Sequence, residues 1–479
     1  MREFGLYIGG RWREATGGGH FDAIDPASGQ AVATVALGTP EDVDLAVAAA
    51  AAATKEWQAL APRERAAALR RMADALLAET DDLARLETLD AGGTLAYSVI
   101  TVRDIAARRF EYFAGLADKL TGEQLPVRDG YHVYTVREPL GVTAHIVPWN
   151  GPLWEASRSL APALAAGNAA IIKPAQDALL GAMRLGEIAK AAGLPDGLVN
   201  VVPGPGATVG EALLAHPGVH GVTFTGSVAV GRRVMERAAG TLKRLVLELG
   251  GNAANIVFPD ADLDAAVAGS IAAAFSNAGQ ICVAGPRLLV HEDVLPEFTE
   301  LFLESVARLS VGPGLEDHDI TPVVSERHMR YVLDMISAGR AEGARLLTGG
   351  ARVTDGALAN GYFVAPTVFD RVDSRMRIAR EEVFGPVVTI QGFATEDEAV
   401  ALANDTEYGL ANGMWTNDLA RAHRVAARLQ SGQVYVNEWF CGDVSCPAGG
   451  YKLSGFGREE GQQAVDNYLQ LKSVRMRVG

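Results

Sequence analysis

The stretch GVTFTGSVAVGRRVMERAAGTLKRLVLELGG, residues 221–251, contains a complete strand–helix–strand pattern. Two short apolar runs, at 221–226 and 244–251, flank a segment of helix length at 228–240. Strands that are apolar along most of their length and alternate with helices are typical of a parallel sheet covered on both faces. The stretch therefore predicts one unit of a doubly covered α/β sheet.

Three further apolar runs upstream extend this pattern to five strands. They are GVTAHIVPW, NAAIIKPA and GLVNVVPG, which begin at residues 141, 168 and 197. Helix-length segments at 152–166, 177–192 and 207–215 separate the runs. In such sheets, ligands bind at the carboxyl ends of the strands. The residues that end each run are therefore the candidate site residues.

The rest of the chain predicts a second α/β unit and two surface strands. A chain of 479 residues is too long for one core, which indicates two or three domains. Stretches 131–141 and 468–478 alternate apolar and polar side chains like surface strands, which a partner subunit would cover. The other predicted elements are the strands LYIGGRW, NIVF, PRLLVH, PVVTI, GMWT and GQVYVNE, the helices 41–57, 62–90, 262–276, 293–309, 326–342, 396–404 and 418–430, and a loop at 349–363.

The composition excludes several classes of partner. A formal net charge of -15 and an isoelectric point near 5.1 argue against nucleic acid and against an anionic membrane. No uncharged run approaches the roughly 18 residues that a membrane span needs, and the first residues are unlike a signal peptide. The three cysteines have no metal-type spacing, so we expect a reducing cytoplasm and no metal site.

Glycines and a lysine at the strand ends indicate a cofactor. The third and fourth strands run into PGPGATVG (203–210) and FTGSVAVG (224–231). Glycines let a cofactor approach the backbone, and a helix amino end offers N–H groups to phosphate. Neither stretch is GxGxxG, and turn glycines are common, but two such loops on consecutive strands favour a dinucleotide. Lys173, at the end of the second strand, can contact ribose or phosphate; a solvated lysine is the alternative.

Two polar side chains at strand ends suit catalysis. Glu248 ends the fifth strand among leucines, where desolvation should raise the carboxyl pKa and poise the group as a general base. A glutamate that caps the next segment is the alternative. Asn150 follows the first strand, and a buried amide there can donate a hydrogen bond to a developing oxyanion. A turn asparagine is the alternative.

Cys282 stands in FSNAGQICVAGPR, residues 275–287. A free cysteine is most often a buried apolar filler. Here Asn, Gly and Gln precede the thiol and Pro286 follows it, which favours an accessible loop over a packed helix. On an accessible loop the thiol can act as a nucleophile, because the thiolate is the reactive form of cysteine.

Together these residues resemble the aldehyde dehydrogenase superfamily. The resemblance covers essentially the whole chain, and Glu248 lies 34 positions before Cys282, the kind of gap that this family keeps between base and nucleophile. Any one motif would be weak evidence, whereas the full series in this order is very specific. The motifs are YIGGRW, DPASGQ, PWN, AAGNAAIIKPA, VNVVPG, FTGS, LELGGN, FSNAGQIC, EEVFGP, VYVNE and GGYKLSGFGRE.

The resemblance implies residue roles. Cys282 would be the nucleophile and Glu248 the base that activates water, while Asn150 and the backbone N–H of Cys282 would form the oxyanion hole. It also implies NAD as cofactor, a small-molecule aldehyde as substrate and a homodimer or homotetramer. The residues that match cofactor-contact positions are Trp149, Lys173, Gln176, Gly206, Phe224, Gly226, Ser227, Leu249, Glu382 and Phe384.

The fold class that the resemblance implies is α/β and aldehyde dehydrogenase-like, with three parts. A Rossmann-type parallel-sheet cofactor domain would comprise residues 1–119 and 141–250. A second α/β domain, 251–450, would carry the nucleophile. A small bridging β-sheet from 120–140 and 451–479 would serve oligomerisation and account for the two surface strands.

Gln176 departs from the pattern of many relatives, which have a glutamate three positions after the strand-end lysine. That glutamate binds the adenosine ribose and would repel a 2′-phosphate, whereas a neutral amide would not. We therefore expect NADP to be tolerated. NAD stays favoured, because no arginine stands beside Gln176 in the sequence to hold a phosphate.

The predicted substrate pocket also departs from the family pattern. Gly151 replaces a common Phe, and Ala448 replaces the usual Phe before GGYK, so we expect a wide pocket. Arg158 is a position where relatives that act on aromatic aldehydes or carboxylate-bearing semialdehydes often have arginine; pairing with Glu155 is the alternative. A bulky, aromatic aldehyde is favoured and a carboxylate-bearing semialdehyde is the alternative. The remaining predicted pocket residues are Trp154, Trp439 and Phe440.

Two other functions compete with aldehyde oxidation to the acid. In a CoA-acylating enzyme, CoA would take the acyl group, but such relatives usually lack the glutamate of LELGG, which is Glu248 here. A catalytically silent binding protein on this scaffold would have no reason to keep Cys282, Glu248 and Asn150 together.

Overall fold

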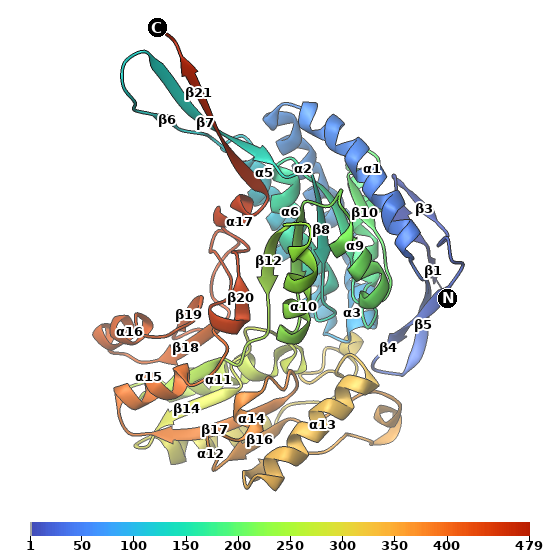
Figure 1. Ribbon diagram of the computed structural model, residues 1–479. Coiled ribbons are helices and arrows are strands. Elements are labelled where there is room, and N and C mark those ends of the chain that lie inside the picture. The colour runs from blue at the N-terminus through green and yellow to red at the C-terminus, as the bar shows by residue number, and fades with distance from the viewer. Residues whose placement is uncertain (1) are drawn as a thin grey trace.

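The computed structural model describes residues 2–479 and contains two large sheets, one above the other in Figure 1. The first sheet has the strand order β20-β12-β11-β8-β9-β10-β2-β3. Its five central strands are all parallel, which confirms the predicted doubly wound sheet. These strands are β8 (Val142–Ile146), β9 (Ala169–Lys173), β10 (Val199–Val201), β11 (Gly221–Thr225) and β12 (Arg244–Glu248).

The strand order places a topological switch point beside β8. From β8 the chain proceeds to β9 and β10 on one side, and then returns to add β11 and β12 on the other side. Connections therefore leave the carboxyl ends of β8 and β11 in opposite directions, and in sheets of this kind ligands bind at that position. All five candidate loops at the strand ends lie along the same edge.

Antiparallel strands close both edges of this sheet. β20 (Gly455–Phe456) pairs with β12, although we predicted residues 451–479 to belong to the bridging sheet. At the other edge the predicted single strand LYIGGRW is a hairpin of β2 (Leu6–Ile8) and β3 (Arg11–Arg13). The turn between them needs Gly9 and Gly10, whose φ angles are 64° and 77°.

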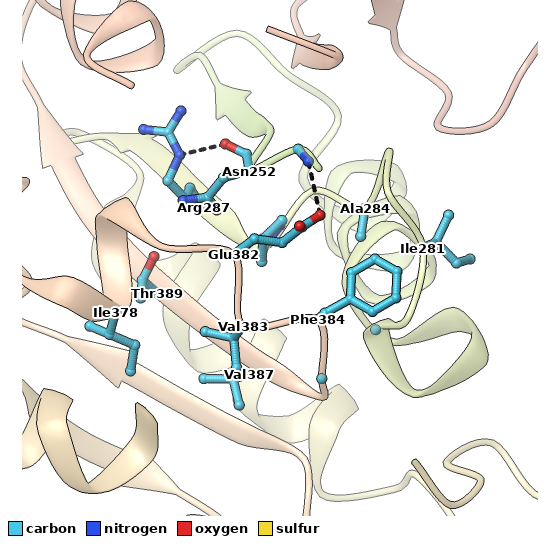
Figure 2. Close-up of a pocket in the computed structure, with 14 residues that line it drawn as sticks. Asn252, Ile281, Ala284, Arg287, Ile378, Glu382, Val383, Phe384, Val387 and Thr389 are labelled. Atoms are coloured by element: carbon cyan, nitrogen blue, oxygen red, sulfur yellow. Dashed lines mark hydrogen bonds between the residues drawn. The ribbon is translucent and has the colours of Figure 1, made fainter. Parts of the chain in front are cut away.

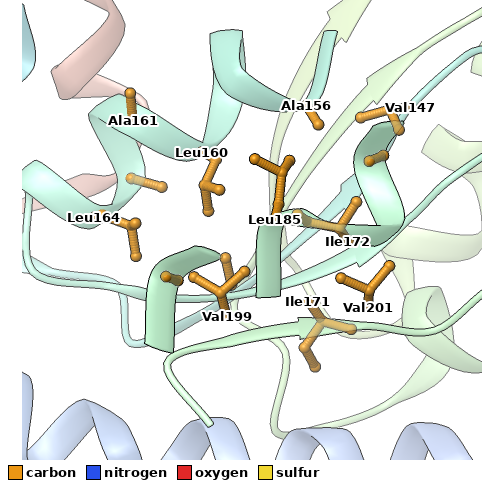
Figure 3. Close-up of a cluster of buried hydrophobic side chains, with 14 of the residues drawn as sticks. Val147, Ala156, Leu160, Ala161, Leu164, Ile171, Ile172, Leu185, Val199 and Val201 are labelled. Carbon is orange, nitrogen blue, oxygen red and sulfur yellow. The ribbon is translucent and has the colours of Figure 1, made fainter. Parts of the chain in front are cut away.

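The helix α6 (Pro152–Ala165) fills the space above β8 and β9 (Figure 3). Every residue of α6 except Trp154 is buried. Leu160 and Leu164 belong to the same buried cluster as Ile171 and Ile172 of β9. Burying each such side chain stabilises the fold by about 1.5–3 kcal/mol, so α6 is held firmly against the sheet. Polar groups on this helix are therefore rigidly placed.

The predicted helices occur, with two breaks that the sequence pattern did not show: one at Glu79, and one at Arg184, where the segment predicted as a single helix at 177–192 forms two short helices. The segment 62–90 is two helices, α2 (Pro62–Ala78) and α3 (Thr80–Ala91), because Glu79 leaves the helical conformation. Asp81 and Asp82 then stand in the first turn of α3, where carboxylates favour a helix start. The other helices of the first part are α1 (Pro40–Ala59), α4 (Leu95–Ile100), α5 (Ala107–Leu116), α7 (Leu180–Met183), α8 (Leu185–Ala191), α9 (Glu211–Ala215) and α10 (Val228–Ala239).

The second sheet has the order β15-β16-β17-β14-β13-β18-β19 and carries the nucleophile loop. Five of its strands match the predicted runs: β13 (Ala254–Val257), β14 (Arg287–His291), β17 (Val387–Phe393), β18 (Ala411–Trp415) and β19 (Gln433–Val436). Not predicted were β15 (Arg345–Thr348) and β16 (Thr367–Asp370). Its helices are α11 (Leu263–Phe275), α12 (Leu295–Val306), α13 (Glu326–Ala341), α14 (Arg377–Arg380), α15 (Glu396–Asn404) and α16 (Leu419–Ala426).

The two predicted surface strands pair with each other. β7 (Tyr131–Pro139) and β21 (Leu469–Arg477) form a nine-residue antiparallel ladder, which β6 (Gln124–Leu125) extends. This small sheet projects away from the body of the molecule in Figure 1. Its exposed apolar side chains include Leu471, which is 69% exposed. Assembly and the predicted domain boundaries stay predictions.

Near the amino end, a hairpin of β4 (His20–Asp25) and β5 (Gln30–Ala36) pairs with β1 (Arg2–Phe4) to form a further small sheet that we did not predict. The short helix α17 (Gln463–Asp466) precedes β21. Among the helices formed by residues 2–479, none combines the length and apolar character needed to cross a bilayer.

Candidate active site

The loop that presents Cys282 begins with a strained turn at the end of α11. Asn277, Ala278 and Gly279 are all left-handed, with φ angles of 51°, 54° and 74°. Residues other than glycine rarely adopt this backbone conformation, and residues strained in this way are concentrated at functional sites. At Gly279 a Cβ atom would also collide with the carbonyl oxygen of Gly385, so only glycine fits. The turn takes the chain out of the helix and into the loop that the sequence predicted.

Hydrogen bonds hold this loop in place. Asn277 Nδ2 donates to the carbonyl oxygen of Asn150 at 3.2 Å. Gln280 Nε2 donates to the Asn277 carbonyl at 3.0 Å, while its Oε1 accepts from Val324 N at 2.9 Å. Asn277 and Gln280 therefore have structural roles. Asn277 links the loop to the segment at Asn150, and Gln280 links it to the segment at Val324. Cys282 itself is partly exposed.

Cys282 opens onto a cavity of about 430 Å³. Four predicted site residues, Asn150, Trp154, Arg158 and Phe440, line the cavity together with it. Ala448, which we expected to widen the pocket, also belongs to the lining. The aromatic part of the wall comes from Tyr97, Trp154, Tyr435 and Phe440.

Gly151 and Trp439 were predicted to line the substrate pocket, but neither lines this cavity. Gly151 is the N-cap residue of α6, and a Cβ atom there would lie 3.3 Å from Trp154 Cβ. Its missing side chain therefore accommodates Trp154 and does not widen the pocket. Trp439 is 7% exposed, and its indole N–H donates to the Val283 carbonyl at 3.0 Å. The ring packs behind the nucleophile loop.

Asn150 reaches the same loop from the end of β8. Its Nδ2 donates to the carbonyl oxygen of Gln280 at 3.1 Å. The side-chain amide therefore lies beside the residues that precede Cys282, next to the cavity. This hydrogen bond joins the loop after β8 of the first sheet to the nucleophile loop before β14 of the second sheet.

Glu248 ends β12 and is 4% exposed. Within residues 2–479, its Oε1 makes no hydrogen bond. Burial, followed by repulsion from Glu459, raises the carboxyl pKa well above its usual value, which confirms the predicted desolvation. Glu248 therefore holds its proton at pH values where an exposed glutamate has lost it.

The thiol of Cys282 is shifted in the same direction. Burial, with a further contribution from Glu155, raises its pKa to about 12. The positive charge of Arg158 acts against this shift. Because only the thiolate is nucleophilic, the reactivity of Cys282 rises with pH over the neutral range.

A network of buried charges surrounds these two groups. Arg158 is ion-paired with Glu155, at 2.6 Å between Nη2 and Oε2, and also with Glu459. The predicted alternative, an Arg158–Glu155 pair, is thus confirmed. Arg109 is 1% exposed and pairs with Glu460. Each guanidinium of the cavity interior therefore already has a carboxylate partner.

Arg109 is a cavity residue that the sequence reasoning missed. It lies on α5 between Ala106 and Phe113, which are both buried, so its position on an apolar helix face was the available signal. Its Nη1 donates to the Trp154 carbonyl at 2.6 Å and to Ser157 Oγ at 3.1 Å. Arg109 thus fixes the start of α6 and the cavity wall.

The predicted cofactor residues lie along the carboxyl edge of the first sheet. Lys173 ends β9, is 5% exposed, and donates through Nζ to the Pro174 carbonyl at 2.9 Å. Burial lowers its pKa to about 8. Gly206 has open space where a Cβ would stand, whereas at Gly226 a Cβ would lie 2.7 Å from the Phe224 ring. These glycines leave the backbone accessible at two neighbouring strand ends.

Two further predicted residues, Ser227 and Leu249, have structural contacts at this edge. Ser227 caps α10 by accepting a hydrogen bond from Val230 N at 3.4 Å. Leu249 is 6% exposed and packs against Gly231, where a Cβ would lie 2.7 Å from a Leu249 methyl. Gln176 is partly exposed in the loop after β9.

Glu382 and Phe384 come from the segment before β17 of the second sheet (Figure 2) and contact the loops that follow β12 and β8 of the first sheet. The Gly251 amide donates to Glu382 Oε1 at 2.8 Å, and burial raises the pKa of this carboxyl to about 8. A Cβ at Gly250 would collide with Glu382, so the GG turn after Glu248 is needed for this close approach. The Phe384 ring meets the Trp149 ring edge to face at 5.3 Å.

The loop that contains Gln176 has an arginine beside it in the folded protein. The sequence shows no neighbouring arginine, but Arg327 of α13 ion-pairs with Asp177 at 2.9 Å. Arg327 is 150 positions away in the chain, so no local pattern could indicate it. Because Asp177 balances its charge, Arg327 does not by itself turn the loop into a phosphate site.

The sequence matches the aldehyde dehydrogenase family over residues 12–474. Solved structures are similar over the whole chain. A Burkholderia cenocepacia protein assigned as an aldehyde dehydrogenase is 44% identical, with a TM-score of 0.97 over 100% of this chain and 98% of that chain. PnpE, solved with nicotinamide adenine dinucleotide, is 42% identical, with a TM-score of 0.97 over 100% and 98%. Betaine aldehyde dehydrogenase from Staphylococcus aureus, solved with NAD+, is 38% identical, with a TM-score of 0.97 over 99% and 95%.

Proposed function

The chain belongs to the aldehyde dehydrogenase family, and we propose that it oxidises a bulky, neutral, preferably aromatic aldehyde to the carboxylic acid with NAD+. The observation that carries this proposal is the meeting of Cys282 and Asn150 at one cavity, with Glu248 buried at the end of β12, two strands from β8 along the same edge of the sheet. Two similar structures hold the NAD cofactor, which supports the same cofactor here.

The residues at the carboxyl edge of the first sheet fit a dinucleotide. Gly206 leaves open space beside the backbone, and within residues 2–479 the Lys173 ammonium makes one hydrogen bond, which leaves further N–H donors for ribose hydroxyls. Glu382 and Phe384 approach the loops after β12 and β8 from the second sheet. When bound, NAD+ supplies the hydride acceptor for the oxidation.

Cys282 would begin the reaction by attacking the aldehyde carbon as a thiolate. The carbonyl oxygen gains negative charge in this step, and Asn150 Nδ2 with the backbone N–H of Cys282 would donate hydrogen bonds to it. Oxidation of this adduct leaves the acyl group on Cys282 as a thioester. Glu248 would then take a proton from water, which hydrolyses the thioester and regenerates the thiol.

The charges in the cavity support a neutral substrate. Arg158 is balanced by Glu155 and Glu459, and Arg109 by Glu460, so neither guanidinium is free to hold a carboxylate. The aromatic wall and the volume of about 430 Å³ suit a ring-sized group, within the roughly 300–1,000 Å³ usual for ligand pockets. A small aldehyde would leave most of this apolar surface unfilled.

A substrate panel tests this proposal. We expect kcat/KM for benzaldehyde-type substrates to exceed that for acetaldehyde and for succinic semialdehyde by at least about tenfold, because each buried carbon adds about 1 kcal/mol to binding. The measurement is NADH formation at fixed NAD+ concentration. Ala448→Phe is the matched variant, since it fills the cavity that Ala448 lines, and it should lower the ratio of aromatic to acetaldehyde activity. A preference for the semialdehyde would contradict the neutral-substrate proposal.

Replacing Gln176 by glutamate should increase the preference for NAD over NADP. A carboxylate there would accept hydrogen bonds from ribose hydroxyls but repel a 2′-phosphate. We expect the NAD to NADP ratio of kcat/KM to rise by at least about tenfold, the effect of 1.4 kcal/mol of repulsion. Gln176→Asn, which stays neutral, is the control. An unchanged ratio in Gln176→Glu would mean that Gln176 does not face the adenosine ribose.

A further inference from the structure

Arg158 occupies an unusual place for a charged residue. It lies on the buried helix α6, is 8% exposed, and lines the same cavity as Cys282. Its guanidinium pairs with Glu155 of its own helix and with Glu459 of the segment after β20, and its Nη2 donates to Thr225 Oγ1 at 3.2 Å. The Arg158 guanidinium is thus engaged by two carboxylates and one hydroxyl of the protein.

These contacts bring the Arg158 charge next to the proposed base. Thr225 is the direct neighbour of Glu248 in the parallel pairing of β11 with β12. Glu248 is buried, and its Oε1 makes no hydrogen bond in the described part of the chain. The carboxyl therefore depends on charges a few ångströms away to offset its desolvation.

We propose that Arg158 is a positioning residue that acts through its charge: held between Glu155 and Glu459, it favours the ionised forms of Glu248 and Cys282, and it does not bind substrate. The inference rests on the proposed function, because the roles of Glu248 and Cys282 belong to that function. Glu155 acts in the opposite sense, since its negative charge opposes ionisation of both groups. The directions of the pKa shifts agree, because Arg158 lowers and Glu155 raises the pKa of both Glu248 and Cys282.

The other charges that face these groups come from three segments. Glu459 opposes the ionisation of Glu248, whereas Arg458 of the same segment favours it. Glu382 opposes formation of the Cys282 thiolate. Arg109 and Glu460 act on Glu459, and the buried Tyr468 faces both Glu459 and Arg158. Arg158 and Arg458 both favour the ionised form of Glu248, and Arg158 has the larger effect.

The test compares pH profiles of three variants. In Arg158→Gln, both groups lose a stabilising cation, so the rising acid limb of kcat/KM should move to higher pH by about 1 unit. Glu155→Gln removes a repelling charge and should move the limb to lower pH. Arg158→Lys keeps the charge and should stay close to the parent. A merely structural role would lower activity and melting temperature in these variants without moving the limb in opposite directions.

A second readout does not require aldehyde oxidation. With Cys441 and Cys446 changed to serine, Cys282 is the one remaining thiol, and its alkylation by iodoacetamide at pH 8.5 reports the thiolate fraction. Alkylation should slow by about tenfold in Arg158→Gln, the effect of one pKa unit, and accelerate in Glu155→Gln. If Arg158→Gln fails to fold, the test depends on whether alkylation of Cys282 is faster in Glu155→Gln than in the parent.

The outcomes separate the two proposals. An inactive parent enzyme whose alkylation rates still shift as expected would remove the proposed function but keep the electrostatic role of Arg158. An active parent whose profile and alkylation rates do not move would overturn that role. A rise in KM confined to carboxylate-bearing aldehydes in Arg158→Gln, with an unmoved acid limb, would identify Arg158 as a substrate-binding residue and would also overturn it.

Discussion

Cys282→Ala should lose aldehyde dehydrogenase activity by a factor on the order of 10⁴ or more, the scale of removing a covalent nucleophile. Alanine leaves the strained turn at 277–279 intact, so the loop should keep its position. Without the sulfur there is no adduct from which a hydride can leave and no carrier for the acyl group. The measurement is the steady-state rate of NADH formation. A matched NAD+ binding titration shows whether cofactor binding is unchanged in the variant.

The chain provides matched controls for this variant. Cys441 and Cys446 are exposed and line the same cavity as Cys282. Replacing either by serine should change kcat by less than about threefold, because neither lies on the loop beside Asn150. Persisting turnover in Cys282→Ala, or an equal loss in Cys441→Ser, would place the nucleophile elsewhere.

Glu248→Gln should slow turnover by about 10² to 10⁴, the usual range for removing a general base. Glutamine keeps the shape of the side chain at the end of β12 but cannot accept a proton. Attack by Cys282 and the oxidation that follows do not need a base for water, so the acyl group should accumulate on the thiol. Rapid mixing should then show a burst of NADH equal to the enzyme concentration, followed by a slow steady state.

An added nucleophile gives the control for Glu248→Gln. Hydroxylamine attacks a thioester without a base to activate it, and it should restore much of the steady-state rate. Loss of the burst to the same extent as the steady state would contradict the assignment, since Glu248 would then act before the thioester forms. Faster turnover of the parent enzyme with CoA, with acyl-CoA as product, would instead support the CoA-acylating alternative.

Local patterns in the sequence were enough for the five parallel strands of the first sheet and for the nucleophile loop. The apolar runs that end at Lys173 and Glu248 are the strands β9 and β12, because a strand buried on both faces must be apolar over its own short length. The prediction was less accurate at 62–90, because a break at one residue, Glu79, leaves the helical spacing almost unchanged. It was also less accurate at 6–13, where a single predicted strand is a hairpin. The strands β15 and β16 were missed for want of a distinct apolar run.

The cavity is where sequence reasoning was incomplete. Gly151 and Trp439 were assigned to it by position in their motifs, but one accommodates Trp154 and the other packs behind the nucleophile loop. Arg109, which does line it, was not predicted, although a charged residue on a buried helix face was visible. Side chains next to a motif point into or away from a pocket according to the packing of neighbouring elements, and spacing alone does not contain that information.

The sequence by itself determined which residues end each strand, and therefore which side chains could gather at one edge of a parallel sheet. The tertiary structure alone decided how their charges are balanced. Arg109 and Glu460 are 351 positions apart, and Arg158 meets Glu459 only where the segment after β20 folds back onto α6. Backbone patterns follow from near neighbours in the chain, whereas the ionisation of a buried group follows from every charge that packing brings within a few ångströms.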